Sequence, residues 1–394
     1  MSAGRAGAVV ASGEMEPWSD RNGPVGPAGG PALSGLLADV LPAVGRGLVL
    51  GPHEDEIVLA AARRCGHLTV LLRSSADATA LAERVGGAAV TIVAGSLDGF
   101  VAGDPDPFGL VVAADGLDRV LGTDSPALSW PQRWDLTCGL ATPDAVVVLG
   151  LENEFSVGAL LDARPAEARH GDEEWRPLHS DPDRPVGAER LRALVARDGS
   201  PVRRLWTAYG GAGTSAPRVL AEVGALSAGR PGCPLPEAAA AALHLTDRPL
   251  LAAPDEAVAL ATRAGLLAAV GDGWLVLAGG PDGAGHDAYV DLPSTPGVVR
   301  ADRRPGPRGG AGSWVLRGET AGSPPERPAG GAPVERHAGP AEQVAGERAT
   351  VVVDPAALPT EVPDAPSVYT ALLAMAEAED VAAFRDTAAR VGAW

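Results

Sequence analysis

The stretch GLVLGPHEDEIVLAAARRCGHLTVLL, residues 47–72, decides the fold class of this chain. Two short apolar runs, 47–51 and 67–72, flank a segment whose apolar residues recur at helical spacing. Short, fully apolar strands that alternate with helices are typical of parallel sheets covered on both faces. The stretch therefore predicts a strand, a helix and a second strand parallel to the first.

The same alternation continues after residue 72. A helix is expected over 75–87 and another near 131–140, and apolar strands over 88–95, 108–114 and 144–151. Strands and helices in this order predict a doubly wound, Rossmann-like α/β domain with a mostly parallel sheet.

Composition sets the expected domain boundaries. A further strand (201–210), a helix (254–271) and a strand (273–280) extend the α/β pattern, whereas Gly- and Pro-rich segments lie on both sides of it. Such segments are typical of flexible chain. We expect a disordered arm over 1–30, the α/β domain over 31–280, a Gly/Pro/Arg-rich linker over 281–349 and a small helical segment over 350–394.

Charge and composition exclude several classes of function. The 394 residues carry 32 basic and 50 acidic side chains, a formal net charge of −18, and contain no lysine. Schiff-base and Walker-lysine chemistry are therefore excluded, and binding to nucleic acid or anionic membranes is disfavoured. The three cysteines form no CxxC pair, which predicts no metal site and a cytoplasmic protein. The Ala-, Arg-, Gly- and Pro-rich composition is of a high-GC bacterial, actinobacterial type.

A ligand crevice is expected at the carboxyl ends of the strands, where the strand order reverses. The first strand is followed by Gly51-Pro-His-Glu-Asp-Glu56, which places three carboxylates at a helix N-terminus. These charges disfavour the phosphates of NAD, FAD or a nucleoside triphosphate. They conflict less with a phosphate-free cationic ligand such as S-adenosylmethionine, and in the alternative interpretation they only cap the helix.

Three segments resemble the core of the class I S-adenosylmethionine-dependent methyltransferases. They are the Gly51 turn between strand and helix, FGLVVAADGLDRV (108–120) and ATPDAVVVLGLEN (141–153), and the likeness covers roughly residues 35–280. The resemblance implies a seven-stranded sheet whose last strand is antiparallel, with S-adenosylmethionine as cofactor. It places the cofactor-binding residues at Gly51, His53, Arg73, Ser96 and Asp115.

Several of these positions depart from the family pattern. Only Gly51 remains of the glycine-rich turn, and Ser96 stands where the family often has aspartate. Arg73 stands where the family has a carboxylate that accepts the ribose hydroxyls, and a guanidinium cannot accept hydrogen bonds. In a purely structural role, Arg73 is expected to pair with Asp98 or Glu54.

The acceptor side is expected after the fifth strand. Glu152 and Asn153 are candidate substrate contacts or a helix N-cap, and Trp175 is a candidate contact in the polar segment 162–185. His170 and His179 in the same segment are candidate general bases for an acceptor hydroxyl. The alternative is a solvated acidic loop without metal, because no recognised ligand spacing is present.

Two functions follow from the sequence. The first is methyl transfer from S-adenosylmethionine to an unidentified small-molecule acceptor. The second is a noncatalytic binding or scaffold protein that keeps the sheet and has lost cofactor affinity, which Arg73 and the missing glycines favour.

Overall fold

The computed structural model describes most of the chain up to residue 318. The described residues are 7–15, 19–22, 25–165, 181–197, 201–211, 215–227, 235–245, 249–280, 284–291, 298–304, 313–318 and 361–363. The helical segment expected over 350–394 lies outside these ranges, apart from residues 361–363.

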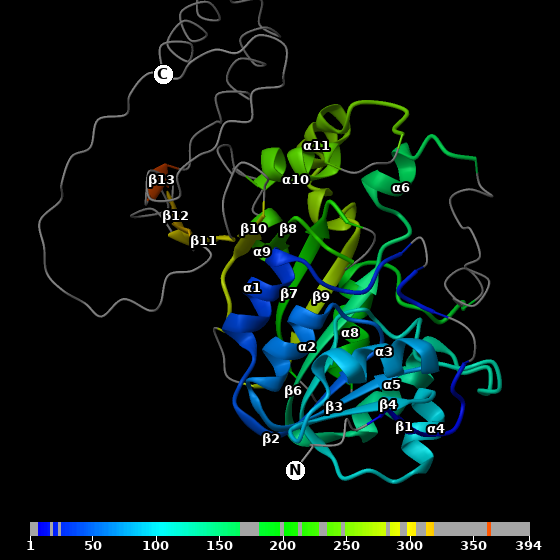
Figure 1. The fold of residues 1–394 in the computed structure, drawn as a ribbon. Helices are drawn as coiled ribbons and strands as arrows, with labels where there is room; N and C mark the ends of the chain where they lie inside the picture. Colours follow the sequence, from blue (N-terminus) through cyan, green and yellow to red (C-terminus); the bar gives the residue numbers. More distant parts are fainter. Residues whose placement is uncertain are drawn as a thin grey trace, which may run out of the picture.

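Seven strands of one larger sheet form the centre of the fold (Figure 1). Along the chain these strands are β2 (Val44–Leu50), β3 (Cys65–Leu72), β4 (Val90–Ala94), β5 (Phe108–Ala113), β6 (Ala141–Glu152), β7 (Val202–Tyr209) and β9 (Gly273–Ala278). In space they run β4-β3-β2-β5-β6-β9-β7, and β9 is antiparallel to both of its neighbours. The strand order reverses between β2 and β5, and in sheets of this kind ligands bind at the carboxyl ends of such a strand pair. The mostly parallel, doubly wound fold expected from the sequence is confirmed.

Helices cover both faces of this sheet because its strands are apolar on both sides. Leu48 and Leu50 of β2 face one core and Val49 the other, as the two-residue period of a strand requires. The Val49 face packs against α1 (Pro31–Val40), α2 (Asp55–Ala62) and α3 (Ser75–Val85), which Figure 1 shows along one side of the sheet. The opposite face packs against α4 (Leu97–Ala102), α5 (Trp130–Gly139) and α8 (Ala188–Arg197).

Two tryptophans anchor α5 in the core. Trp130 and Trp134 are fully buried, and their rings stack with centroids 6.5 Å apart. The helix begins with a capping box between Ser129 and Gln132. Both tryptophans therefore serve packing, as their spacing of one helical turn suggests.

The described part of the N-terminal segment is packed, in contrast to the disordered arm expected over 1–30. β1 (Val9–Val10) pairs in parallel with β4, and the side chains of Met15 and Ala28 are buried. A Gly/Pro-rich composition indicates only a weak local preference for helix or strand. In this protein, contacts with the sheet hold the segment in place.

The sheet also continues beyond residue 280, where composition predicts a linker. An antiparallel series follows β7: β8 (Val219–Glu222), β10 (Ala288–Val290), β11 (Val299–Arg304), β12 (Ser313–Gly318) and β13 (Glu361–Pro363). The remaining helices are α6 (Val157–Leu161), α9 (Val223–Ser227), α10 (Leu235–His244) and α11 (Pro254–Arg263). Among the described residues, no helix is long and apolar enough to cross a membrane.

Candidate functional site

The candidate site lies at the carboxyl edge of the parallel strands. Gly51, Arg73, Ser96 and Asp115 each follow the end of one strand, β2, β3, β4 and β5 respectively. Gly51 turns the chain with a positive φ of 81°. A Cβ atom at this position would lie 3.4 Å from Oδ2 of Asp115, so these two residues are close neighbours.

His53 is buried beside this turn. Its Nδ1 lies 3.0 Å from the carbonyl oxygen of Gly51, so Nδ1 carries the proton and donates it. Among the described residues, Nε2 has no hydrogen-bond partner. Burial lowers the pKa of His53, and the nearby Asp115 carboxylate opposes this shift only in part. The ring is therefore neutral near pH 7.

Arg73 forms a buried ion pair with Asp20. Its Nε donates to Oδ2 of Asp20 at 2.8 Å, its Nη2 to Oδ1 at 2.6 Å, and its Nη1 to the carbonyl of Leu121 at 3.1 Å. The arginine is 3% exposed and the aspartate 6%. The partners expected from the sequence are wrong: Asp98 accepts from the Ser125 hydroxyl, and Glu54 accepts from the backbone N–H of Gly30.

Asp115 forms an ion pair with Arg119. The guanidinium also donates to three carbonyl oxygens, those of Asp20 at 2.9 Å, Val25 at 2.9 Å and Gly26 at 2.8 Å. We call residues 19–22 and 25–28 the N-terminal strap. It continues to the Gly51 turn, where the backbone of Ala28 pairs with Pro52 and Glu54.

Ser96 has a structural role at the end of β4. Its hydroxyl caps α4 by accepting from the N–H of Gly99 and donates to the carbonyl of Ser12 at 3.2 Å. Gly13 packs directly on this side chain, since a Cβ at Gly13 would lie 2.1 Å from the hydroxyl oxygen. Ser96 is thus fully covered by the N-terminal segment.

These residues do not fit S-adenosylmethionine. Arg73 can only donate hydrogen bonds, whereas the ribose hydroxyls would need an acceptor at this position. Its Nε and Nη2 atoms are already bound to the Asp20 carboxylate. The Asp115 carboxylate is held by Arg119, and Ser96 is covered by Ser12 and Gly13. The structure brings the predicted cofactor residues to one edge of the sheet, but each of them binds the chain itself.

The two predicted residues after β6 also have internal partners. The side-chain amide of Asn153 donates to the carbonyls of Phe155, Ala269 and Gly271, and Asn153 is 5% exposed. The carbonyl of Glu152 accepts from Arg184 at 3.0 Å. Neither residue caps α6, whose N-cap is Ser156. Asn153 therefore fixes this loop to the one that precedes β9.

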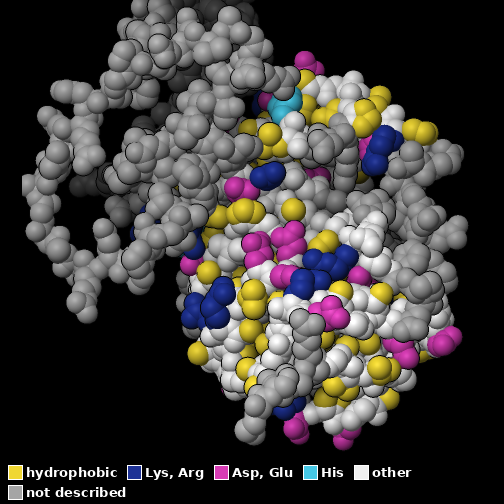
Figure 2. All heavy atoms as spheres, viewed as in Figure 1, with side chains coloured by type: hydrophobic (Ala, Val, Ile, Leu, Met, Phe, Trp, Pro, Cys, Tyr) yellow, Lys and Arg dark blue, Asp and Glu magenta, His cyan; other side chains and the backbone are white. Residues whose placement is uncertain are grey.

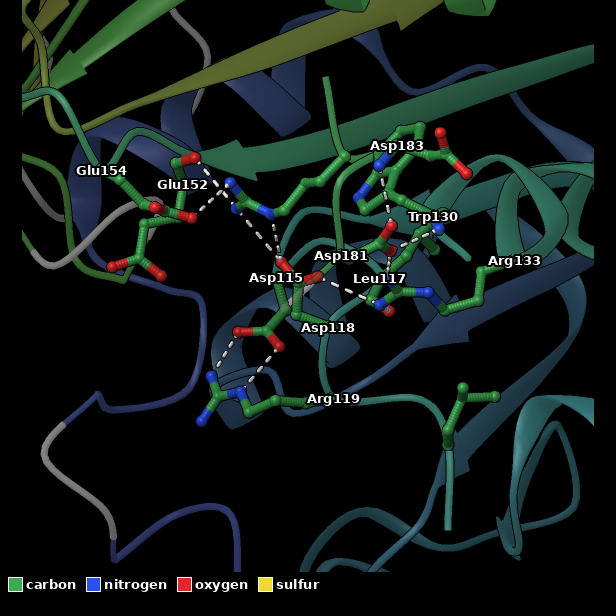
Figure 3. Close-up of polar contacts among 12 residues, drawn as sticks. Asp115, Leu117, Asp118, Arg119, Trp130, Arg133, Glu152, Glu154, Asp181 and Asp183 are labelled. Atoms are coloured by element: carbon green, nitrogen blue, oxygen red, sulfur yellow. Dashed lines mark hydrogen bonds and ion pairs between the residues drawn. The ribbon is translucent and has the colours of Figure 1, made fainter. Parts of the chain in front are cut away.

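A second set of buried charges lies next to Asp115 (Figure 3). Asp118 accepts from Arg133 at 3.0 Å and from Arg184 at 3.2 Å, and Arg133 also donates to Asp181 at 2.6 Å. The network joins the loop after β5, helix α5 and the segment 181–184. Within the described residues, no group of three or more His, Cys, Asp and Glu side chains could hold a metal.

The other acceptor-side candidates, His170, Trp175 and His179, lie outside the described residues. Sequence reasoning missed Asp20, Asp77, Arg119 and the Asp118 network. One signal was present: Asp115 and Arg119 are opposite charges four positions apart.

No protein-family model matches the sequence, and no curated protein is similar to it. Several solved structures match at low similarity. N-methyltransferase NodS of Bradyrhizobium japonicum WM9 with S-adenosyl-l-homocysteine shares 20% identity over 28% of this chain and 55% of its own, with a TM-score of 0.24. A chain from the complex containing the Haloferax volcanii Trm112 methyltransferase activator is 14% identical in sequence. The match covers 64% of the present chain and 89% of that chain, with a TM-score of 0.37. Geranyl diphosphate methyltransferase with S-adenosylmethionine is 14% identical in sequence. The match covers 63% of the present chain and 84% of that enzyme's chain, with a TM-score of 0.32.

The match to NodS spans only about half of the NodS chain. TM-scores this low do not establish a shared fold or function. The fold assignment rests on the strand order instead. The order β4-β3-β2-β5-β6-β9-β7 with antiparallel β9 defines the fold of the class I S-adenosylmethionine-dependent methyltransferases.

Proposed function

We propose that this chain is a noncatalytic binding protein built on the methyltransferase fold. The observation that carries the proposal is the buried ion pair between Asp20 and Arg73 at the end of β3. The N-terminal strap occupies the crevice in which the family binds its cofactor, and it does so with charge-assisted hydrogen bonds rather than loose contacts.

Opening this crevice for a methyl donor is energetically unfavourable. Displacing the strap leaves Arg73 without its carboxylate and Arg119 without three carbonyl partners. Breaking a buried ion pair by removing one partner costs about 3–5 kcal/mol. The ribose hydroxyls of S-adenosylmethionine would then meet the Arg73 guanidinium, which cannot accept their hydrogen bonds.

Methyl transfer to a small-molecule acceptor is the second candidate. The order of the seven strands and the closeness of Gly51 to Asp115 favour it, because both features belong to the family pattern. This function requires the strap to leave the crevice before the donor enters.

Calorimetric titration of the full chain with S-adenosylmethionine and S-adenosylhomocysteine separates the two candidates. We expect no saturable heat at millimolar ligand. Micromolar binding that is lost in Asp115→Asn would overturn the noncatalytic proposal and establish the crevice as a cofactor site.

A further inference from the structure

The Ser19-Asp20 dipeptide of the strap is bound through its side chains and its backbone together. The Asp77 carboxylate accepts the Ser19 hydroxyl at 2.7 Å and the Asp20 N–H at 2.8 Å. Arg73 binds the Asp20 carboxylate through two nitrogens, and Arg119 donates to the Asp20 carbonyl at 2.9 Å. Every polar group of Asp20 therefore has a charged side chain as partner.

We propose that Arg73, Asp77 and Arg119 form a recognition site for a peptide that carries Ser-Asp, and that the chain fills this site with its own strap. The proposal deepens the proposed function, because it rests on a crevice that serves binding rather than catalysis. It assigns the ligand class as an aspartate-bearing peptide.

The three recognition residues are preorganised. Arg73 directly follows β3, Arg119 lies in the loop after β5, and Asp77 lies in the first turn of α3. Their exposed fractions are 3%, 4% and 6% respectively. The N–H of Asp77 is itself bound by the Ser74 hydroxyl at 3.0 Å, which fixes the start of α3. Side chains held this firmly lose little entropy when a ligand binds.

The arrangement favours a peptide carboxylate over other anions. The planar guanidinium of Arg73 matches a carboxylate through two parallel hydrogen bonds. Asp77 accepts hydrogen bonds beside it, so it would repel phosphate or another anion that offers no N–H or O–H donors. Arg119 binds the carbonyl oxygens of Asp20, Val25 and Gly26, which a peptide backbone bent around the guanidinium supplies.

A tethered strap competes with any peptide added from outside. Intramolecular ligands on short tethers act at effective concentrations of the order of millimolar. The unmodified chain should therefore bind a separate Ser-Asp peptide only weakly. Removing the Asp20 carboxylate should vacate the Arg73 subsite and allow such a peptide to bind.

The test uses the full chain carrying Asp20→Ala and a fluorescently labelled peptide Ser-Asp-Arg-Asn, which copies residues 19–22 and is blocked at both ends. We expect its affinity for Asp20→Ala to exceed that for the unmodified chain at least tenfold. The peptide with alanine in place of aspartate should not bind, and the double variant Asp20→Ala/Arg73→Gln should lose binding. Acetate and inorganic phosphate, tested separately, should compete poorly.

The control variant is Asp106→Ala, which removes an exposed carboxylate paired with Arg46 and should leave peptide affinity unchanged. Should Asp20→Ala not fold, Asp20→Asn keeps the side-chain volume and takes its place. Equal affinity for the unmodified chain and the variant, or none for a folded variant, would overturn the site. Titrating S-adenosylmethionine into the unmodified chain tests the proposed function separately, because the peptide result does not depend on it.

Discussion

Asp20 and Arg73 lie 53 positions apart in the sequence and join the N-terminal strap to the end of β3 through two parallel hydrogen bonds of 2.8 and 2.6 Å. Both side chains are almost completely removed from water. The pair closes the edge of the sheet at which related folds bind their ligands.

The first prediction concerns the stability of this pair. Arg73→Met should lower the free energy of unfolding by about 3–5 kcal/mol, because it leaves the Asp20 carboxylate buried without its partner. Urea denaturation measures the loss. Asp20→Leu combined with Arg73→Met should be less destabilised than Arg73→Met alone, since no buried charge then remains unpaired.

Its matched control is the exposed pair of Asp106 and Arg46, whose side chains are 84% and 41% exposed. Asp106→Asn should cost no more than about 1 kcal/mol, because water solvates both partners. Equal losses from the two pairs would contradict the role given to burial.

The second prediction concerns Asp118. Asp118→Ala removes the carboxylate that both buried guanidinium groups, those of Arg133 and Arg184, bind. We expect a loss of at least about 3 kcal/mol. Hydrogen exchange should also show weaker protection over residues 181–197 than in the unmodified protein.

Asp183→Ala is the control for this experiment, since Asp183 is exposed and lies two residues from Asp181. It should change the stability by less than about 0.5 kcal/mol, as is usual for surface positions. Unchanged exchange in Asp118→Ala would show that the network does not hold the segment.

The third prediction concerns pH. Burial lowers the pKa of His53 below its ordinary value of 6.5, so the unfolded chain binds the proton more readily than the folded one. The contribution of His53 to stability is therefore complete above pH 6.5 and is lost as the pH falls below it. Unfolding free energies measured from pH 7.5 to 5 should decline less steeply in His53→Asn, whose amide can still donate to the Gly51 carbonyl. An identical slope in both proteins would mean that His53 is not buried as described.

The fourth prediction concerns the turn after β2. Gly51→Ala should destabilise the protein by about 1–2 kcal/mol, because φ is 81° there and the added methyl approaches Asp115. Thermal unfolding reports the change. Gly45→Ala in β2 should be nearly neutral, since no atom lies within 4 Å of its added Cβ.

The face drawn in Figure 2 shows no continuous row of basic side chains of the kind that nucleic-acid binding needs. Acidic and basic side chains lie next to each other there, and apolar ones are scattered between them. This pattern agrees with the excess of 50 acidic over 32 basic residues in the whole sequence.

Sequence alone determined the type and order of the core strands. Runs such as 47–51, 67–72 and 108–114 are apolar on both faces, and only a sheet covered by helices on both sides buries such strands. Because these strands run parallel, their carboxyl ends meet at one edge of the sheet, and Gly51, Arg73, Ser96 and Asp115 lie there. The location of the site was therefore predictable, although its chemistry was not.

Tertiary structure decided what those residues do. Asp20 lies in a Gly/Pro-rich segment without local structural preference, and its distance in sequence from Arg73 hides their pairing. Asp118, Arg133 and Arg184 look like ordinary solvated charges in the sequence, because burial depends on segments that meet only in the folded chain. Apolar periodicity is a local property that a sequence displays, whereas the partner of a buried charge is set by long-range packing.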